Sequence, residues 1–163
     1  MVERITADAF RSGLERLNVA GVLSASLKKD LEILREGLEK VSNWTQAESH
    51  FKQVGIGAIE ASGPMSKVYR ILTCLMEILE KHATDLVESG WSIDSVSLLD
   101  VESGCSTYTG RLVVQAKDQN GNAAALIDGP FVWDCAAHGI PQTEAAQALG
   151  YQCIVKFPRI QIP

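Results

Sequence analysis

The feature that most constrains this sequence is a change of hydrophobic period at Gly90. Before Gly90, apolar residues recur every three or four positions, as in amphipathic helices; after it they alternate, and β-branched residues become frequent. A helical pattern followed by a strand pattern predicts an α+β domain, with helices packed on a mainly antiparallel sheet. We therefore expect one domain, 1–163, with a helical part at 1–90 and a β-rich part at 91–163.

The helical part divides into four predicted helices. The first follows Thr6, the second follows a cap at Ser24 or Ser26, and the third opens at the capping box Thr45-Gln46-Ala47-Glu48. The fourth runs from Pro64 to Gly90 and has the broadest apolar face, which we expect to serve more than one neighbour and to support a homo-oligomer. Its stripe is Val68, Leu72, Leu75, Leu79 and Leu86.

The β-rich part predicts a sheet of about four strands with one short inserted helix. The expected strands are 91–101, 107–117 and 123–127, with Asn120-Gly121 as the turn between the last two. Gly129-Pro130 predicts a break before 131–133. The short helix covers 141–149, and 151–157 alternates as a final strand.

Charge and composition limit the partners. The chain has 15 Lys and Arg against 20 Asp and Glu, a net charge of -5, which disfavours nucleic acid and anionic membranes. No apolar run approaches the roughly 20 residues of a membrane span. Cys74 lies within the apolar helix stripe, where a thiol behaves as a small hydrophobe, so we expect reduced cysteines and a cytoplasmic protein.

One pair of segments carries a resemblance to an enzyme family. Asp100 at the end of one strand, with Gln115-Ala116-Lys117 on the next, looks like a degenerate form of the PD-(D/E)XK nuclease motif. The resemblance implies a divalent metal held by acidic groups, with the lysine near an attacking water. Gln115 stands where that motif has an acid, and a neutral amide weakens metal binding.

Two further patterns give weaker indications. Residues 139–151 resemble the first helix and turn of a helix-turn-helix unit, but 151–157 favours a strand where the recognition helix should follow. Cys135 and His138 have a C-x-x-H spacing, which suits zinc or an activated thiol but is far short of a four-ligand set. We therefore predict no nucleic-acid partner, no metal and no cofactor.

The candidate ligand site lies in two segments, 102–111 and 128–138, where the strand pattern lapses. The hairpin at Asn120-Gly121 should bring Asp128 back to the level of Arg111. The residues expected on the walls of this site are Tyr108, Arg111, Trp133 and His138.

Packing stripes are the clearest signals in this chain, so we predict a non-enzymatic binding or assembly protein, with a protein or small-molecule ligand left open. The alternative is a small metal-dependent nuclease or hydrolase built on Asp100 and Lys117. A pocket in which such groups converge would favour the enzyme, and scattered positions would favour the binder. Compact acidic domains of this kind also suggest a mobile-element origin, such as an integron cassette.

Overall fold

The computed structural model describes residues 4–41, 43–53, 57–61, 65–103, 107–134, 154–156 and 159–163, excluding the side chains at 4–6, 53, 66, 100–103, 107, 108, 133, 134 and 154–156. Within these ranges the chain is α+β, as the sequence predicts. The elements are α1 (Arg4–Ala20), α2 (Ala25–Lys40), α3 (Trp44–Gln53), β1 (Ile59–Ala61), α4 (Met65–Lys81), α5 (Ala83–Glu88), β2 (Trp91–Ser103), β3 (Thr107–Asp118), β4 (Ala123–Asp134) and β5 (Ile154–Lys156).

The strands form one mixed sheet in the order β1-β2-β3-β4-β5. β2, β3, β4 and β5 pair antiparallel, while β1 pairs parallel to β2. β1 is short and lies within 55–63, a stretch of the sequence that contains three glycines and separates the expected third and fourth helices. Its pairing can be parallel because α4 and α5 intervene and carry the chain back before β2 begins.

The helix boundaries differ from the expected ones at two places. α3 begins at Trp44 because Asn43 acts as its cap, with its Oδ1 accepting the Gln46 N–H at 2.9 Å. The helix expected over 64–90 is two helices, because His82 leaves helical geometry at φ -107° and ψ 3°. The break turns α5 away from the axis of α4.

β4 is continuous through Pro130, where the sequence predicts a break. Pro130 pairs with Arg111 of β3, and on the outer side of β4 the described β5 pairs only with Val132 to Asp134. A proline within a sheet is tolerated where its missing N–H is not required by a neighbouring strand, and no described strand pairs with Pro130 on this outer side. Gly110 supports the same stretch, since a Cβ at this position would lie 2.7 Å from the Leu99 carbonyl oxygen and 2.8 Å from the Phe131 ring.

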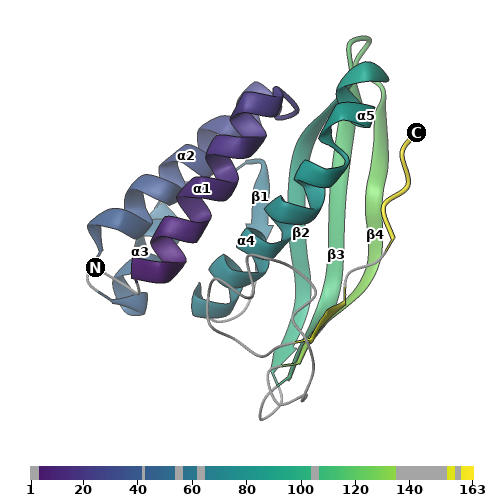
Figure 1. Ribbon diagram of the computed structural model, residues 1–163. Helices are drawn as coiled ribbons and strands as arrows, with labels where there is room; N and C mark the ends of the chain where they lie inside the picture. Colours follow the sequence, from purple (N-terminus) through teal and green to yellow (C-terminus); the bar gives the residue numbers. More distant parts are fainter. Residues whose placement is uncertain are drawn as a thin grey trace.

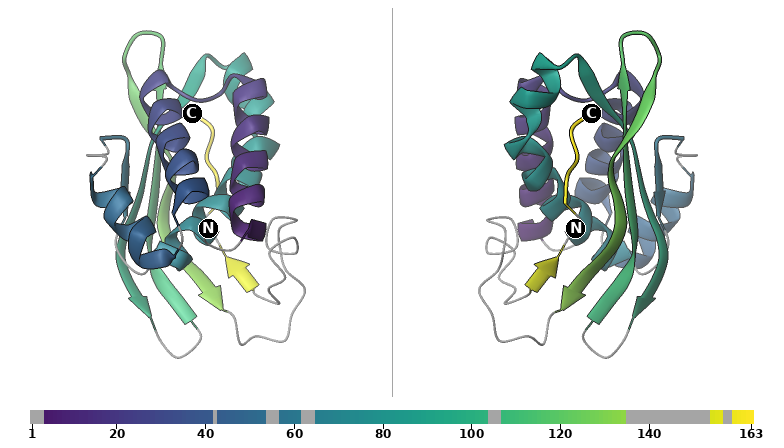
Figure 2. Two further views of the ribbon diagram at one scale, coloured as in Figure 1. Left: turned by 90° about the vertical axis from the view of Figure 1, so that its left-hand side faces the viewer. Right: turned by 90° about the vertical axis from the view of Figure 1, so that its right-hand side faces the viewer.

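The two faces of the sheet have different surroundings. α1, α4 and α5 lie over one face, while α2 and α3 lie toward the β1 edge (Figures 1 and 2). Residues on the covered face are buried, and alternate residues on the opposite face of β3 and β4 are exposed or half-buried. We call the second face the open face; its exposed described residues on β3 and β4 include Arg111, Gln115, Lys117, Ala125 and Asp128.

The leucine-rich stripe from Val68 to Leu86 is consumed inside the chain. All five of its side chains are at most 2% exposed, and Cys74 is buried beside them. The stripe therefore offers no surface to a second copy, and the reason given for self-association is wrong. Self-association itself stays a prediction. The expected helix at 141–149, the residues Cys135, His138 and Cys153, and the ends of the expected final strand lie outside the described residues.

Candidate functional site

The predicted ligand site lies on paired strands more than on loops. The register places Tyr108 opposite Trp133, and Arg111 opposite Pro130. Residues 107–111 and 128–134 therefore belong to β3 and β4, which corrects the expectation of two open segments. Tyr108 and Trp133 are described by their backbone only, and His138 lies outside the described residues.

The hairpin does bring Asp128 to the level of Arg111. The Arg111 guanidinium donates from Nε at 2.9 Å and from Nη2 at 2.6 Å to one oxygen, Oδ1, of Asp128. The two side chains are 55% and 43% exposed. An exposed pair of this kind stabilises the fold little. It does occupy the guanidinium that was expected to meet a ligand.

Asp100 and Lys117 do not converge. Lys117 pairs with Ser92, and Arg111 at the other end of β3 pairs with Leu99, next to Asp100. Asp100 therefore lies eight positions along β2 from the partner of Lys117, roughly 26 Å at about 3.3 Å per residue. The nuclease resemblance requires these positions to be close together, and the register separates them.

Lys117 instead contributes to a polar hollow at the opposite end of the sheet. The hollow lies where the start of α2, residues 57–58 and the bulged part of β2 meet, and it has a volume of about 510 Å³. We call it the α2–β2 hollow. Its lining consists of Ser26, Lys29 and Asp30 from α2, Gly57 and Ala58, Asp94 and Ser95 from β2, and Lys117 from β3.

Backbone hydrogen bonds hold the start of α2 and the bulged part of β2 together at the α2–β2 hollow. The turn before α2 runs beside β2, with Ser24 N–H donating to the Ile93 carbonyl at 2.9 Å and Ile93 N–H donating to Val22 at 2.7 Å. The Ser24 side chain also caps α2 by accepting the Leu27 N–H at 3.2 Å. These bonds fix the first turn of α2 against β2.

Ala58 connects residues 57–58, the remaining wall of the hollow, to both α2 and β2. Its N–H donates to Oδ2 of Asp30 at 2.9 Å, and its carbonyl accepts the Val96 N–H at 2.9 Å. Asp94 is the residue at the β2 register shift between Ile93 and Ser95. A bulge of this kind re-aims side chains, and here it contributes both Asp94 and Ser95 to the lining of the hollow.

The charges in the α2–β2 hollow are mixed, and three of them are uncommitted. Asp30 is held by Ala58, whereas the side chains of Lys29, Asp94 and Lys117 make no ion pair or hydrogen bond in the described part of the molecule. This contrasts with Arg111 and Asp128, which satisfy one another. Two ammonium groups and one carboxylate around one hollow can meet a ligand that bears charge of both signs.

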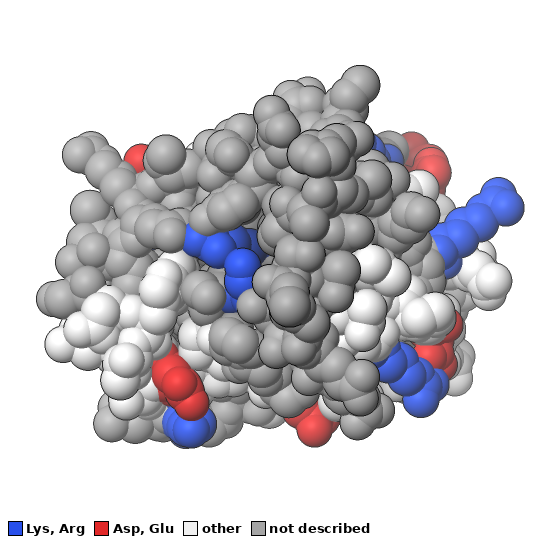
Figure 3. All heavy atoms as spheres, turned by 90° about the horizontal axis from the view of Figure 1, so that it is seen from below, with Lys and Arg blue, Asp and Glu red and all other residues white. Residues whose placement is uncertain are grey.

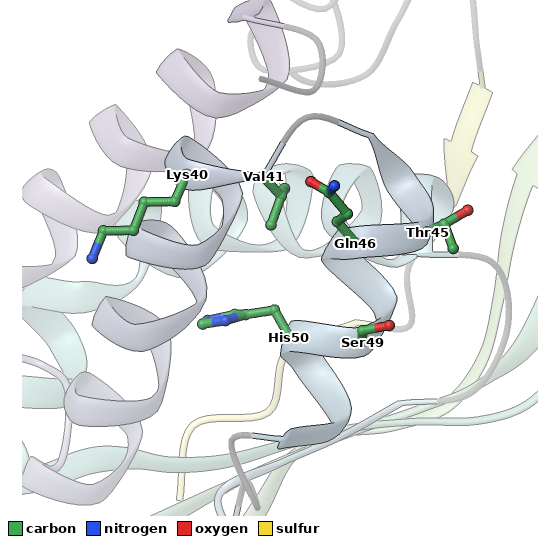
Figure 4. A pocket seen from close by; sticks show the side chains of 6 residues that line it. All are labelled: Lys40, Val41, Thr45, Gln46, Ser49 and His50. Atoms are coloured by element: carbon green, nitrogen blue, oxygen red, sulfur yellow. The ribbon is translucent and has the colours of Figure 1, made fainter.

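A second hollow, of about 360 Å³, lies between the end of α2 and α3 (Figure 4). Its lining includes Lys40, Gln46, Ser49 and His50. The His50 ring points to α2, where Nε2 lies 3.2 Å from the Ile33 carbonyl oxygen, while the Ser49 hydroxyl points away from it. The ring fills the space that a Cβ on Gly37 would need. His50 is therefore a packing residue between two helices. Because the Ser49 hydroxyl points away from the His50 ring, the two residues do not form a nucleophile and its base.

α4 carries buried polar groups within the helical layer. Arg70, Thr73 and Glu77 are at most 6% exposed, and the Arg70 guanidinium lies 6.0 Å from the Trp44 ring centroid. Tyr69 is fully buried between Phe10 and Trp44, and its hydroxyl makes no hydrogen bond with a described residue. Burial raises the pKa of Tyr69 above its ordinary value. These groups face the core, so they contribute to packing.

The α2–β2 hollow was missed in the sequence because its residues form no motif. Lys29 and Asp30 read as the polar face of a helix, Asp94 as one residue of an alternating strand, and Lys117 as part of the degenerate nuclease pattern. The only local signal was the stretch from Gly55 to Gly63, whose glycines interrupt the helical pattern. Nothing local indicates that these segments meet.

One face of the molecule shows described charges of both signs. Seen from below, Lys and Arg side chains are interspersed with Asp and Glu (Figure 3). In the described ranges no group of three or more His, Cys, Asp or Glu side chains could hold a metal ion. No helix built from those same residues is both long and apolar enough to cross a membrane.

No family model, curated protein or solved structure matches this chain.

Proposed function

We propose that this protein is a non-enzymatic binding protein that takes up a small zwitterionic ligand in the α2–β2 hollow. The observation that carries the proposal is the set of uncommitted charges there: Lys29 and Lys117 from two different elements, and Asp94 between them in the chain. In this proposal the lysines bind the anionic group of the ligand, and Asp94 accepts hydrogen bonds from its ammonium group.

The dimensions of the hollow support a small ligand. A volume of about 510 Å³ lies within the usual range of roughly 300–1,000 Å³ for small-molecule sites. The hydroxyls of Ser26 and Ser95 supply neutral donors and acceptors beside the charges. The walls are tied together by backbone hydrogen bonds, so little ordering is needed on binding.

Binding is favoured over catalysis by the arrangement of the acidic and basic groups. Asp100 and Lys117, on which the enzyme alternative depends, stand at opposite ends of the β2–β3 pair. His50 is committed to the contact between α2 and α3. The groups that remain available in the hollow are lysines, a carboxylate and hydroxyls, a set that recognises charge.

The test is calorimetric titration of the full chain with phosphoethanolamine, which carries a phosphate and an ammonium group. Lys117→Gln should weaken binding about tenfold, as expected for the loss of one charge-assisted contact in a partly exposed site. Lys28→Gln is the matched control, because Lys28 is an exposed lysine of α2 next to the lining residue Lys29 and does not itself line the hollow. It should bind like the parent protein.

One probe that lacks the ammonium group and one variant that lacks the carboxylate sharpen the result. Inorganic phosphate should bind the parent protein more weakly than phosphoethanolamine does. The Asp94→Asn variant should bind phosphoethanolamine only about as tightly as the parent protein binds phosphate. No saturable binding of either probe, or equal losses in Lys117→Gln and Lys28→Gln, would overturn the proposal.

The proposal retains two expectations from the sequence, cytoplasmic location and self-association. Cell fractionation tests the first, with the protein expected in the soluble cytoplasmic fraction. Sedimentation of the purified chain at micromolar concentration tests the second, and a monomer at all concentrations would contradict it.

A further inference from the structure

The outer edge of β4 carries an extended segment of the chain that is not part of a regular ladder. β5 pairs with β4 only at Val132 to Asp134. Farther along the same edge, residues 159–163 run beside β4, and Gln161 N–H donates to the Leu126 carbonyl at 2.8 Å. The C-terminal segment lies next to β4 in Figures 1 and 2.

The C-terminal segment has the burial pattern of a strand. Arg159, Gln161 and Pro163 are exposed, whereas Ile160 and Ile162 are half-buried and pack against the core. One face of this segment thus provides two aliphatic side chains, and its backbone provides a donor. A peptide that adds to the edge of a sheet is recognised by these same two features.

β4 has a local reason to accept such a segment at Leu126. The register shifts there, so that Ile127 pairs with Val114 and Ala125 pairs with Gln115, and Leu126 has no partner on β3. Its carbonyl is thereby available to the outer side of the strand. From Ala123 to Ala125 the edge is uncharged, and uncharged edges are prone to pair with another strand.

The hold on the C-terminal segment is slight compared with the ladders inside the sheet. β3 pairs with β4 over most of its length, whereas the segment shows one backbone hydrogen bond to β4 among the described residues. Pro130 lacks an N–H, so β4 has no backbone donor at this position. A segment held in this way can be exchanged for a competitor.

We propose that the β4 edge from Ala123 to Phe131 is a binding site for an extended peptide with an aliphatic-polar-aliphatic pattern, and that residues 159–163 are its resident occupant. The partner is defined by the chemistry of that occupant: two aliphatic side chains two positions apart, with a backbone N–H between them. The site is distinct from the α2–β2 hollow, because no residue of β4 or of the C-terminal segment lines that hollow.

The probe for this site is a fluorescent peptide with the sequence of residues 157–163, titrated by anisotropy into the full chain. In the parent protein the resident segment competes at a high effective concentration, so binding should be weak. In the full-chain variant Ile160→Asp with Ile162→Asp, the resident segment should leave the edge. The peptide should then bind at least about tenfold more tightly. Gln161→Ala is the matched control, because it keeps the backbone donor and both isoleucines.

Two additional measurements keep the test decisive. A peptide N-methylated at its glutamine lacks the donor to Leu126 and should bind the double variant about tenfold more weakly than the unmodified peptide. If the double variant fails to fold, Gln161→Pro removes the same donor from the resident segment without burying charge, and should admit the peptide. The proposal is overturned by equal peptide affinity in the parent and the variants, by no binding to any of them, or by indifference to N-methylation.

Discussion

The covered and open faces of the same three long strands differ in what their side chains do. On the covered face Val96, Leu112, Val114 and Phe131 are at most 3% exposed and meet the helical layer. The open face carries charged side chains. Arg111 and Asp128 satisfy one another at one end, and the charges around Lys117 at the other end are uncommitted among the described residues. The buried core and the proposed ligand site therefore use different side chains of one sheet, and we expect that each can be altered alone.

The largest effect should come from truncating the covered face. Phe131→Ala should lower the free energy of unfolding by about 3–5 kcal/mol, because the ring is fully buried and its removal leaves a cavity. Val113→Ala, a half-buried residue of the open face, should cost about 1 kcal/mol or less. Urea unfolding of both variants measures the difference. Similar losses would show that the faces are not distinct.

A smaller effect of opposite sign is expected within the helical layer. Tyr69→Phe should raise the free energy of unfolding by about 1 kcal/mol at neutral pH, since it removes a buried hydroxyl that lacks a described partner. The raised pKa of Tyr69 means that the unfolded chain loses the phenolic proton first as the pH passes 10.0, so the parent protein should lose stability above that pH. Tyr69→Phe should flatten this alkaline decline. A destabilised variant with an unchanged slope would contradict the assignment.

The smallest effect is expected at the exposed β3–β4 turn. Asp118 accepts hydrogen bonds from the Asn122 side chain and from the backbone N–H groups of Asn120 and Asn122, and these bonds hold its pKa below the ordinary 3.8. Its contribution is present above pH 3.8 and is lost as the pH falls through the lowered folded-state value. Asp118→Asn should therefore be slightly destabilised at neutral pH. Its unfolding curve should approach that of the parent in acid, and a gap that widens in acid would refute this.

The sequence predicts those parts of the fold that depend on local pattern. The helical period gives α1, α2 and the stripe of α4, and Asn120-Gly121 gives the β3–β4 hairpin with Asp128 beside Arg111. It fails where a distant contact decides. β1 forms because β2 lies beside it. Pro130 is tolerated within β4 because no described strand pairs with it on the outer side of β4. The break between α4 and α5 at His82 could not be predicted either, because no proline or glycine lies beside it in the sequence.

The candidate site was harder to predict than the fold for the same reason. Arg111 is a conspicuous residue in the sequence, yet in the structure Asp128 occupies its guanidinium. Lys29, Asp94 and Lys117 are separated by more than twenty residues from one another and carry no motif, so only the packing of α2 against β2 brings them to one hollow. Local periodicity contains no information about such a convergence.

The most direct test of the central claim is a chemical-shift map of the ¹⁵N-labelled full chain titrated with phosphoethanolamine. We expect the perturbed backbone amides to cluster at the α2–β2 hollow, at Ser26, Lys29, Gly57, Asp94 and Lys117. The amide signals around Arg111 and Asp128 should not shift. Perturbations centred on Arg111 would contradict it, because recognition would then lie at the end of the open face where the charges are already paired.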